Sequence, residues 1–305
     1  MSQKTQGLLF TLLSGIGFAI ASILMRALNT LTTFTPTQVA ILRFLFAAPI
    51  TWLFLPHQLT KKLGRKVRMN FIFLGLIFSG ASFAAVFALD RLPSSLYIIL
   101  LFTYPSMVTI YSMLTGKPVP ALTWIGLPLS VIGIILMVLH PGNNLRVDWI
   151  GVGLVLINAL ILAVYFILSG KFFPSSDLRL SGTTWIMTGG FLVSLLIGII
   201  FGIRWPQSWL EWLMILGLSI FGTVIPILSA NFGIQLIGPA RASMLVSIQP
   251  ILTILLSLVF FQEVLSPLQW VGAVLLLSAI VLLQSSPDRL ITNMLKQAEN
   301  RSKDL

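Results

Sequence analysis

The segment GPARASMLVSIQPILTILLSLVFFQE, residues 238–263, has a proline in its first helical turn, a second proline at Pro250 and an acidic end. Its core is a run of about 20 predominantly apolar residues, the length that an α-helix needs to cross a bilayer. Pro250 removes one backbone donor and frees the carbonyl four residues earlier, so the segment predicts a kinked membrane helix. The run 93–117 has the same plan, with Pro93 near its start and Pro105 inside.

The composition of the whole chain is that of a membrane protein. Of the 305 residues, 57% are hydrophobic and only 9% are charged, whereas soluble domains carry about 25% charged residues. In lipid every backbone amide must be paired internally, so membrane spans are helices or closed barrels. Continuous apolar runs without period-two alternation favour helices, and the sequence therefore predicts an all-α integral membrane protein.

Ten transmembrane helices are predicted, separated by prolines and short polar stretches. The first apolar run is too long for a signal-peptide core, so it is predicted to be retained as a span. The ten predicted ranges are 7–28, 36–55, 69–89, 93–115, 121–140, 149–170, 180–203, 208–231, 239–261 and 267–284.

Positive charge is distributed unequally between the two ends of these spans. The loop 61–68 holds five Lys or Arg residues, and such clusters mark the cytoplasmic side. With this loop in the cytoplasm, 14 of the 19 Lys and Arg residues are cytoplasmic and four lie outside. Both termini are then predicted to be cytoplasmic, in a multi-pass protein of the cell membrane, either plasma or inner membrane. This asymmetry explains the net charge of +11 without nucleic acid as a partner.

Short motifs repeat in the same order in the two halves of the chain. Leu74-Gly75-Leu76 followed by Gly80 matches Leu216-Gly217-Leu218 followed by Gly222, and Trp124-Ile125-Gly126 matches Trp270-Val271-Gly272. These motifs predict a five-helix repeat at 1–145, a second at 146–287 and a cytoplasmic tail at 288–305. Because five is odd, the second copy must be inverted in the membrane. Inverted repeats are typical of secondary transporters, although the same geometry in a non-transporting protein stays open.

Several of these motifs resemble the C-terminal signature of a known family. The residues are 238–243, Pro250, the Gln262-Glu263 pair and the run Gln269-Trp270-Val271-Gly272-Ala273, which look like the drug/metabolite transporter superfamily, EamA type. The resemblance covers nearly the whole chain and implies a ten-helix carrier with two inverted five-helix repeats. It further implies alternating access through a central cavity and export of small metabolites, amino acids or related compounds. The N-terminal copy has Lys117-Pro118 in place of Gln262-Glu263, so the acidic position is not shared.

Arg43 is the one basic residue predicted to lie within the membrane. If Pro36 begins its helix, Arg43 lies about 10 Å along it at 1.5 Å per residue. A guanidinium at membrane depth costs about 2.5–3.5 kcal/mol, so it is expected to face protein or water. Two interpretations remain open. Arg43 either binds an anionic or carboxylate group of the substrate in the cavity, or it is a structural arginine bonded to helix-end carbonyls.

Polar aromatic and amide side chains are predicted to line the same path. Tyr97 and Tyr104 share one helical face at an interval of seven, and Tyr165 follows Asn158 by seven residues in another span. Gln249, next to an internal proline, corresponds to Tyr104 in the other copy. Flat apolar walls with few hydrogen-bonding groups suit a ligand site. We therefore predict that these residues bind substrate, with ordinary helix packing as the alternative.

The two internal prolines, Pro105 and Pro250, mark the predicted substrate region and are candidate hinges between the halves. A fixed bend that only improves packing is the alternative. Glu263 is predicted to have a structural or gate role and to favour the start of the span at 267–284, since acids stabilise helix N-termini. No acidic residue falls in the middle of a span, so an Asp or Glu proton relay has no candidate.

The sequence predicts no cofactor and no metal site. Cysteine is absent, and the two histidines, His57 and His140, lie at predicted span ends without a nearby acid pair. No nucleotide-binding loop is present. An intramembrane enzyme, or a membrane subunit without transport activity, is the alternative to a carrier. Small residues on the fifth and tenth spans, Gly126 with Gly133 and Gly272 with Ala279, form stripes that point to a homodimer.

Overall fold

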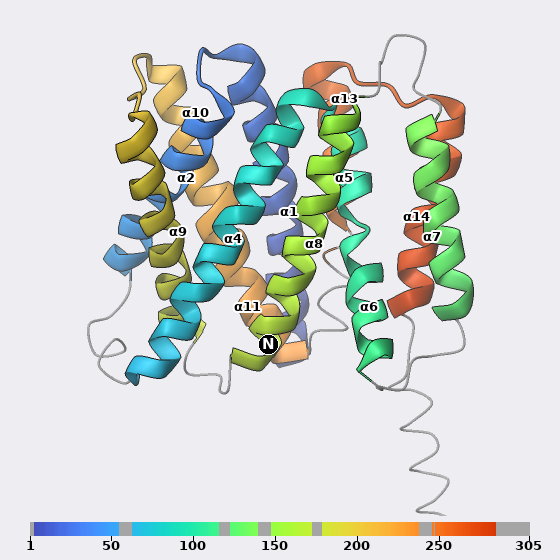
Figure 1. Ribbon diagram of the computed structural model, residues 1–305, viewed down its shortest axis with the longest axis horizontal. Helices are drawn as coiled ribbons and strands as arrows, with labels where there is room; N and C mark the ends of the chain where they lie inside the picture. The colour runs from blue at the N-terminus through green and yellow to red at the C-terminus, as the bar shows by residue number, and fades with distance from the viewer. Residues whose placement is uncertain are drawn as a thin grey trace, which may run out of the picture.

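The computed structural model describes residues 3–54, 63–115, 123–139, 148–172, 179–237, 246 and 248–284, and every regular element in these ranges is helical. Figure 1 shows the helices gathered into one bundle, with α7 and α14 as a pair at one edge. The elements are α1 (Gln3–Leu31), α2 (Pro36–Phe54), α4 (Arg65–Arg91), α5 (Ser94–Leu101), α6 (Tyr104–Leu114), α7 (Thr123–Leu139), α8 (Trp149–Phe172), α9 (Arg179–Phe201), α10 (Trp209–Ser219), the π-helix η2 (Ile220–Val224), α11 (Ile225–Ile237), α13 (Ile248–Phe261) and α14 (Pro267–Gln284).

The lengths of these helices agree with a multi-pass membrane protein. Six helical stretches in the described residues are long and apolar enough to cross a bilayer, and three shorter apolar helices accompany them. The all-helical prediction is confirmed for these parts of the chain. The count of ten spans and the inversion of the second repeat stay predictions.

Three helices begin with a side-chain oxygen that accepts a hydrogen bond from a backbone N–H of the first turn. At the start of α2, the Gln38 N–H donates to Thr35 Oγ1 and the Thr35 N–H donates back to Gln38 Oε1. Ser266 and Gln269 form the same reciprocal pair before α14. Before α10, the Glu211 N–H donates to Ser208 Oγ. Each pattern satisfies backbone donors that the first helical turn leaves without partners.

Two predicted spans are not continuous α-helices. The span predicted at 93–115 is divided into α5 and α6 by a break at Phe102 and Thr103, two residues before Pro105. The break follows from the proline, which has no N–H to continue the ladder. The span predicted at 208–231 contains the π-helical turn η2, a type of local widening that is frequent at functional sites.

Glycines allow α4 and α9 to pack closely. A Cβ atom at Gly75 would lie 2.8 Å from the Cα of Gly189, and one at Gly189 would lie 2.9 Å from the Cα of Gly75. Since real Cβ atoms do not approach so closely, the glycine pair sets the distance between these helices. Gly80, in the same motif as Gly75, has no atom within 4 Å of its Cβ position.

The small-residue stripes on α7 and α14 face each other within one chain, which overturns the reason for expecting a homodimer there. A Cβ at Gly133 would lie 2.8 Å from the carbonyl oxygen of Gly272. Ala279 is fully buried, and α7 and α14 run side by side (Figure 1). Because close backbone approach already uses these stripes, they are not free for a second copy.

Candidate functional site

A cavity of about 90 Å³ lies at the centre of the bundle, and all six residues predicted to bind substrate line it. The helices that contribute to its wall are α1, α2, α4, α5, α6, α8, α11 and α13. The six predicted residues are Arg43, Tyr97, Tyr104, Asn158, Tyr165 and Gln249. They come from five helices in both halves of the chain. Tertiary packing therefore brings these six residues, which were predicted one by one, to the wall of a single cavity.

Arg43 is 3% exposed, and its guanidinium contacts four neutral groups. Nε donates to Thr223 Oγ1 at 2.7 Å, and Nη2 donates to the Gly222 carbonyl oxygen at 3.0 Å. Nη1 donates to Ser82 Oγ at 2.8 Å and lies 3.5 Å from Met25 Sδ. The guanidinium carbon is also 5.7 Å from the ring centroid of Phe78, within cation–π range.

The π-helical turn η2 supplies two of these partners. A π-helix lacks the regular i→i−4 bonds, so its carbonyls and side chains are available to other donors. Thr223 Oγ1 donates to the carbonyl of Leu218, five residues earlier, and accepts from Arg43. The hydroxyl of Ser219, directly before the π turn, donates to the carbonyl oxygen of Arg43 at 3.1 Å. The side chain and the backbone of Arg43 are therefore both hydrogen-bonded to this part of the neighbouring helix.

The tyrosines take different positions around the cavity. The amide Nδ2 of Asn158 donates to the hydroxyl of Tyr97 at 2.9 Å. The ring of Tyr104 stacks on Phe166, with centroids 5.2 Å apart and an interplanar angle of 12°. The ring of Tyr165 packs 5.4 Å from that of Phe78. These rings form flat apolar walls whose polar atoms are few.

Several lining residues were not singled out from the sequence. Ser82, Met25 and Asn231 lie at the cavity and carry no charge, and nothing in their local sequence separates them from ordinary helix residues. Thr223 contacts Arg43 from the π turn, and no pattern in the sequence predicts that turn. Phe18, Phe78 and Phe166 also line the cavity, but they belong to apolar runs in which an aromatic residue is expected to pack in the hydrophobic core.

The candidate hinge prolines lie where helices begin. Pro105 is in the first turn of α6, directly after the break that ends α5, and Pro250 is in the first turn of α13. The neighbouring residues 238–245 lie outside the described residues. The hinge function stays a prediction.

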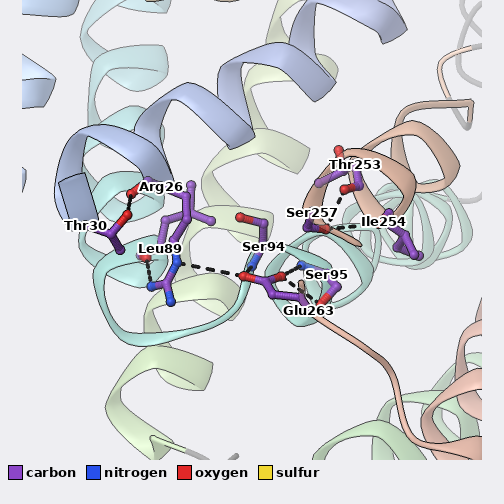
Figure 2. A network of polar contacts seen from close by, with 9 residues as sticks. All are labelled: Arg26, Thr30, Leu89, Ser94, Ser95, Thr253, Ile254, Ser257 and Glu263. Atoms are coloured by element: carbon purple, nitrogen blue, oxygen red, sulfur yellow. Dashed lines mark hydrogen bonds and ion pairs between the residues drawn. The ribbon is translucent and has the colours of Figure 1, made fainter. Parts of the chain in front are cut away.

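Glu263 binds a helix N-terminus, but not the one expected. Its carboxylate accepts from the backbone N–H of Ser94 at 3.2 Å and from the N–H and hydroxyl of Ser95, both at 3.1 Å. It thereby caps α5, whereas α14 begins with its own Ser266–Gln269 pair. The expectation that Glu263 supports α14 is wrong, because the turn after α13 directs the side chain toward α5. Figure 2 shows the carboxylate between α5 and Arg26.

Arg26 completes this contact, which we call the Glu263 cluster: Glu263, Ser94, Ser95 and Arg26. The Nε of Arg26 is 3.9 Å from Glu263 Oε1, and its Nη1 donates to the carbonyl oxygen of Leu89, in the last turn of α4 (Figure 2). The Glu263 side chain is 9% exposed. The cluster joins the ends of α1, α4, α5 and α13, so it connects both halves of the chain at the predicted outer end.

The backbone at Gln262 explains how Glu263 reaches α5. Gln262 has φ of 54°, in the left-handed region that ends many helices. The N–H of Glu263 donates back to the carbonyl of Ser257, six residues earlier, at 3.3 Å, which closes the end of α13. The chain therefore leaves α13 sharply, and the carboxylate points sideways to the neighbouring helix.

No group of three or more potential metal-ligating side chains occurs among the residues that the structure describes. His57, His140 and Lys117 lie outside those residues. The helical bundle and its central cavity define a class of protein: a polytopic membrane protein with a cavity between its helices.

Comparisons with known proteins place the chain within that class. The profile of the EamA-like transporter family matches residues 5–139 and 149–285, so the chain belongs to this family. It is 28% identical over 318 residues to the uncharacterized transporter sll1319 of Synechocystis sp., covering 91% of this chain and 92% of that protein. It is 25% identical over 251 residues to the uncharacterized inner membrane transporter YedA of Escherichia coli, with 81% of each chain covered.

A solved crystal structure aligns with a TM-score of 0.64 at 18% identity, over 90% of this chain and 97% of that one, a likeness of fold alone. The family resemblance read from the sequence is confirmed. The chain is a multi-pass membrane transporter, and the alternative of an intramembrane enzyme is set aside by its family.

Proposed function

We propose that this protein is a secondary transporter that exports small metabolites, amino acids or related compounds, by alternating access through the central cavity. The observation that carries the proposal is the cavity itself, walled by helices from both family-matched halves and centred on the buried Arg43. A site between two repeats is where secondary transporters bind their substrates. The predicted inversion of the second repeat would let the halves open to either side in turn.

The Glu263 cluster supports this mechanism as an outer gate. It joins the end of α13 to the start of α5, through hydrogen bonds between residues that are 169 and 168 positions apart in the sequence. The two halves therefore cannot separate at this end while the cluster is intact. In the proposed cycle the cluster breaks when the cavity opens outward. Pro105 and Pro250, in the first turns of α6 and α13, are the proposed hinges of that movement.

Counterflow in proteoliposomes tests the transport function. Purified protein is reconstituted with an unlabelled compound inside, and uptake of the labelled compound is measured over a panel of amino acids, hydroxy acids, nucleosides and cationic drugs. Transient accumulation of at least one compound, absent from protein-free liposomes, is the expected result. Exchange of none by correctly folded protein would favour a membrane subunit without transport activity.

Single cysteines test alternating access, because the chain has no native cysteine. Ala85→Cys places a thiol at the cavity, and a membrane-impermeant maleimide is applied from each side of oriented vesicles. Val264→Cys and Leu114→Cys, exposed near the predicted outer and cytoplasmic ends, report sidedness. We expect the cavity thiol to react from both sides, with rates that substrate shifts in opposite directions. Reaction from one side under all conditions would overturn the mechanism.

A further inference from the structure

Arg43 is a buried cation without an acidic partner among the described residues. The three ion pairs in those parts of the chain are Arg26–Glu263, Arg91–Asp148 and Arg204–Glu211, none of which lies at the cavity. Of the described residues that line the cavity, none is acidic. A buried charge is costly unless another charge compensates it. The missing negative charge is therefore available to be supplied by a ligand.

The guanidinium also has donor capacity left for such a ligand. Of its five N–H groups, three donate to oxygen atoms, of Thr223, Ser82 and Gly222. A fourth is directed to Met25 Sδ at 3.5 Å, and a thioether sulfur is a weak acceptor. The fifth has no partner among the described residues. A carboxylate is the acceptor that matches a guanidinium best.

Two further polar atoms at the cavity lack partners. Asn158 is 1% exposed, and its Oδ1 has no hydrogen-bond partner among the described residues, although its Nδ2 donates to Tyr97. Tyr165 is 7% exposed, and its hydroxyl likewise has no partner in those parts of the chain. Buried polar atoms are almost always hydrogen-bonded, so each orphaned atom points to a missing partner. Both are neutral, so they can bind a hydroxyl group of a ligand, and neither supplies the negative charge that would offset an ammonium group beside Arg43.

The rest of the wall limits the size and polarity of the ligand. Phe18, Leu101, Leu162 and Phe166 contribute apolar surface around the polar atoms. The volume is about 90 Å³. An apolar cavity of about 150 Å³ holds benzene, so this one suits a compact ligand of a few carbons rather than a large amphipathic compound.

We propose that the cavity binds small hydroxy-monocarboxylates with a net charge of −1 in preference to zwitterionic amino acids and cations. Arg43 binds the carboxylate, and Asn158 Oδ1 with the Tyr165 hydroxyl binds the ligand hydroxyl. An amino acid would place its ammonium group in a site that already holds one cation and offers no acidic acceptor. The inference rests on the proposed transport function only in taking this cavity as the substrate site.

Two matched compound series test the charge preference on the unmodified protein. Lactate, alanine and alaninol share a three-carbon skeleton with charges of −1, 0 and +1 near neutral pH. 2-Hydroxyisovalerate, valine and valinol repeat the series on a branched five-carbon skeleton. Binding is measured by thermal stabilisation in detergent, and transport by counterflow. The expected result is that each hydroxy acid binds and exchanges roughly tenfold better than its amino acid, the effect of one well-placed charge interaction.

The outcomes separate the substrate class from the transport function. Valine or alanine matching its hydroxy acid, or counterflow confined to another class of compound, overturns the substrate class and leaves the carrier intact. Hydroxy acids that bind selectively but never exchange support the site and overturn transport. If no compound binds or exchanges, both proposals fail.

Variants provide a stronger test, because a new preference for the amino acid is a gain of function that misfolding cannot produce. Arg43→Gln is expected to remove the preference for the hydroxy acid over the amino acid. Asn158→Asp places a carboxylate in the cavity and is expected to shift the preference from 2-hydroxyisovalerate toward valine. Arg68→Met is the matched control, because Arg68 stacks on Trp185 away from the cavity. An unchanged preference in a folded Asn158→Asp protein would contradict the assignment of this residue.

Discussion

Two charged side chains of the protein, Arg43 and Glu263, are satisfied in opposite ways. The Glu263 carboxylate meets two backbone N–H groups, a hydroxyl and a nearby guanidinium, so its charge is matched by the fold. Among the described residues Arg43 meets neutral oxygen atoms, a sulfur and the ring of Phe78, so its charge is solvated but not neutralised. The difference indicates that the first charge holds helices together while the second remains able to bind an anion.

Removing the charge of Arg43 should have the largest effect on transport and stability. Arg43→Met is expected to reduce transport of an anionic substrate by at least roughly tenfold and to lower thermal stability, because Thr223, Ser82 and Gly222 each lose a donor worth about 1–3 kcal/mol. Arg43→Lys, which keeps the charge but not the planar fork, should be intermediate. Initial rates and melting temperature are measured together. Arg43→Met with wild-type transport at equal protein level would break the comparison.

Glu263→Gln should weaken the outer end while leaving the cavity intact. It removes charge-assisted bonds to α5, with an expected loss of about 1.5–3 kcal/mol in stability, and it should increase outside labelling of Ala85→Cys. Glu211→Gln is the matched control, since Glu211 accepts from Gln207 within the same cap of α10. The control should lose stability without a change in labelling. Equal labelling in both variants would refute the outer gate.

The backbone at Gln262 offers a smaller and more local test. A β-branched side chain is strained at φ of 54°, whereas glycine is not. Gln262→Val is therefore expected to lower stability by about 1–2 kcal/mol and to mimic part of the Glu263→Gln phenotype, and Gln262→Gly should be neutral or slightly stabilising. Chemical unfolding of the two variants checks the sign. The same stability in both would show that this turn does not position Glu263.

The smallest effect is expected from an exposed pair. The Arg91 guanidinium, 2.9 Å away, and the N–H groups of Gly151 and Ile150 lower the pKa of Asp148. Because the folded pKa lies below the unfolded one of about 3.9, the contribution to stability is complete above that value and is lost as pH falls through the folded pKa. Melting temperatures of the parent and Asp148→Asn, compared from pH 7 downward, should differ slightly at pH 7 and converge in acid. A difference that grows in acid would contradict this.

Much of the candidate site could be predicted from single residues. Arg43 was identified by its depth in a span, where a guanidinium must face protein or water. Tyr97, Tyr104, Asn158, Tyr165 and Gln249 were identified as polar groups in apolar helices, and each lines the cavity. These predictions depend on helical period and membrane depth, which are local properties of the sequence.

The missed features depend on partners far away in the chain. Thr223 meets Arg43 across 180 positions, and only because a π turn widens the helix at that point. The small-residue stripes that contain Gly133 and Gly272 were predicted to support dimerisation, but in the structure they pack against each other within one chain. Glu263 was correctly predicted to stabilise a helix N-terminus, but the helix that it caps is α5 rather than α14.

The sequence by itself determined the class of the protein, because composition, apolar length and prolines fix where helices form in a membrane. It also determined that a charged and several polar groups had to avoid lipid. Only the tertiary structure decided that Arg43 would meet neutral oxygen atoms and Glu263 a helix N-terminus. The reason is physical: which side chains meet across 168 to 180 residues depends on how rigid helices pack, and no local pattern encodes that distance.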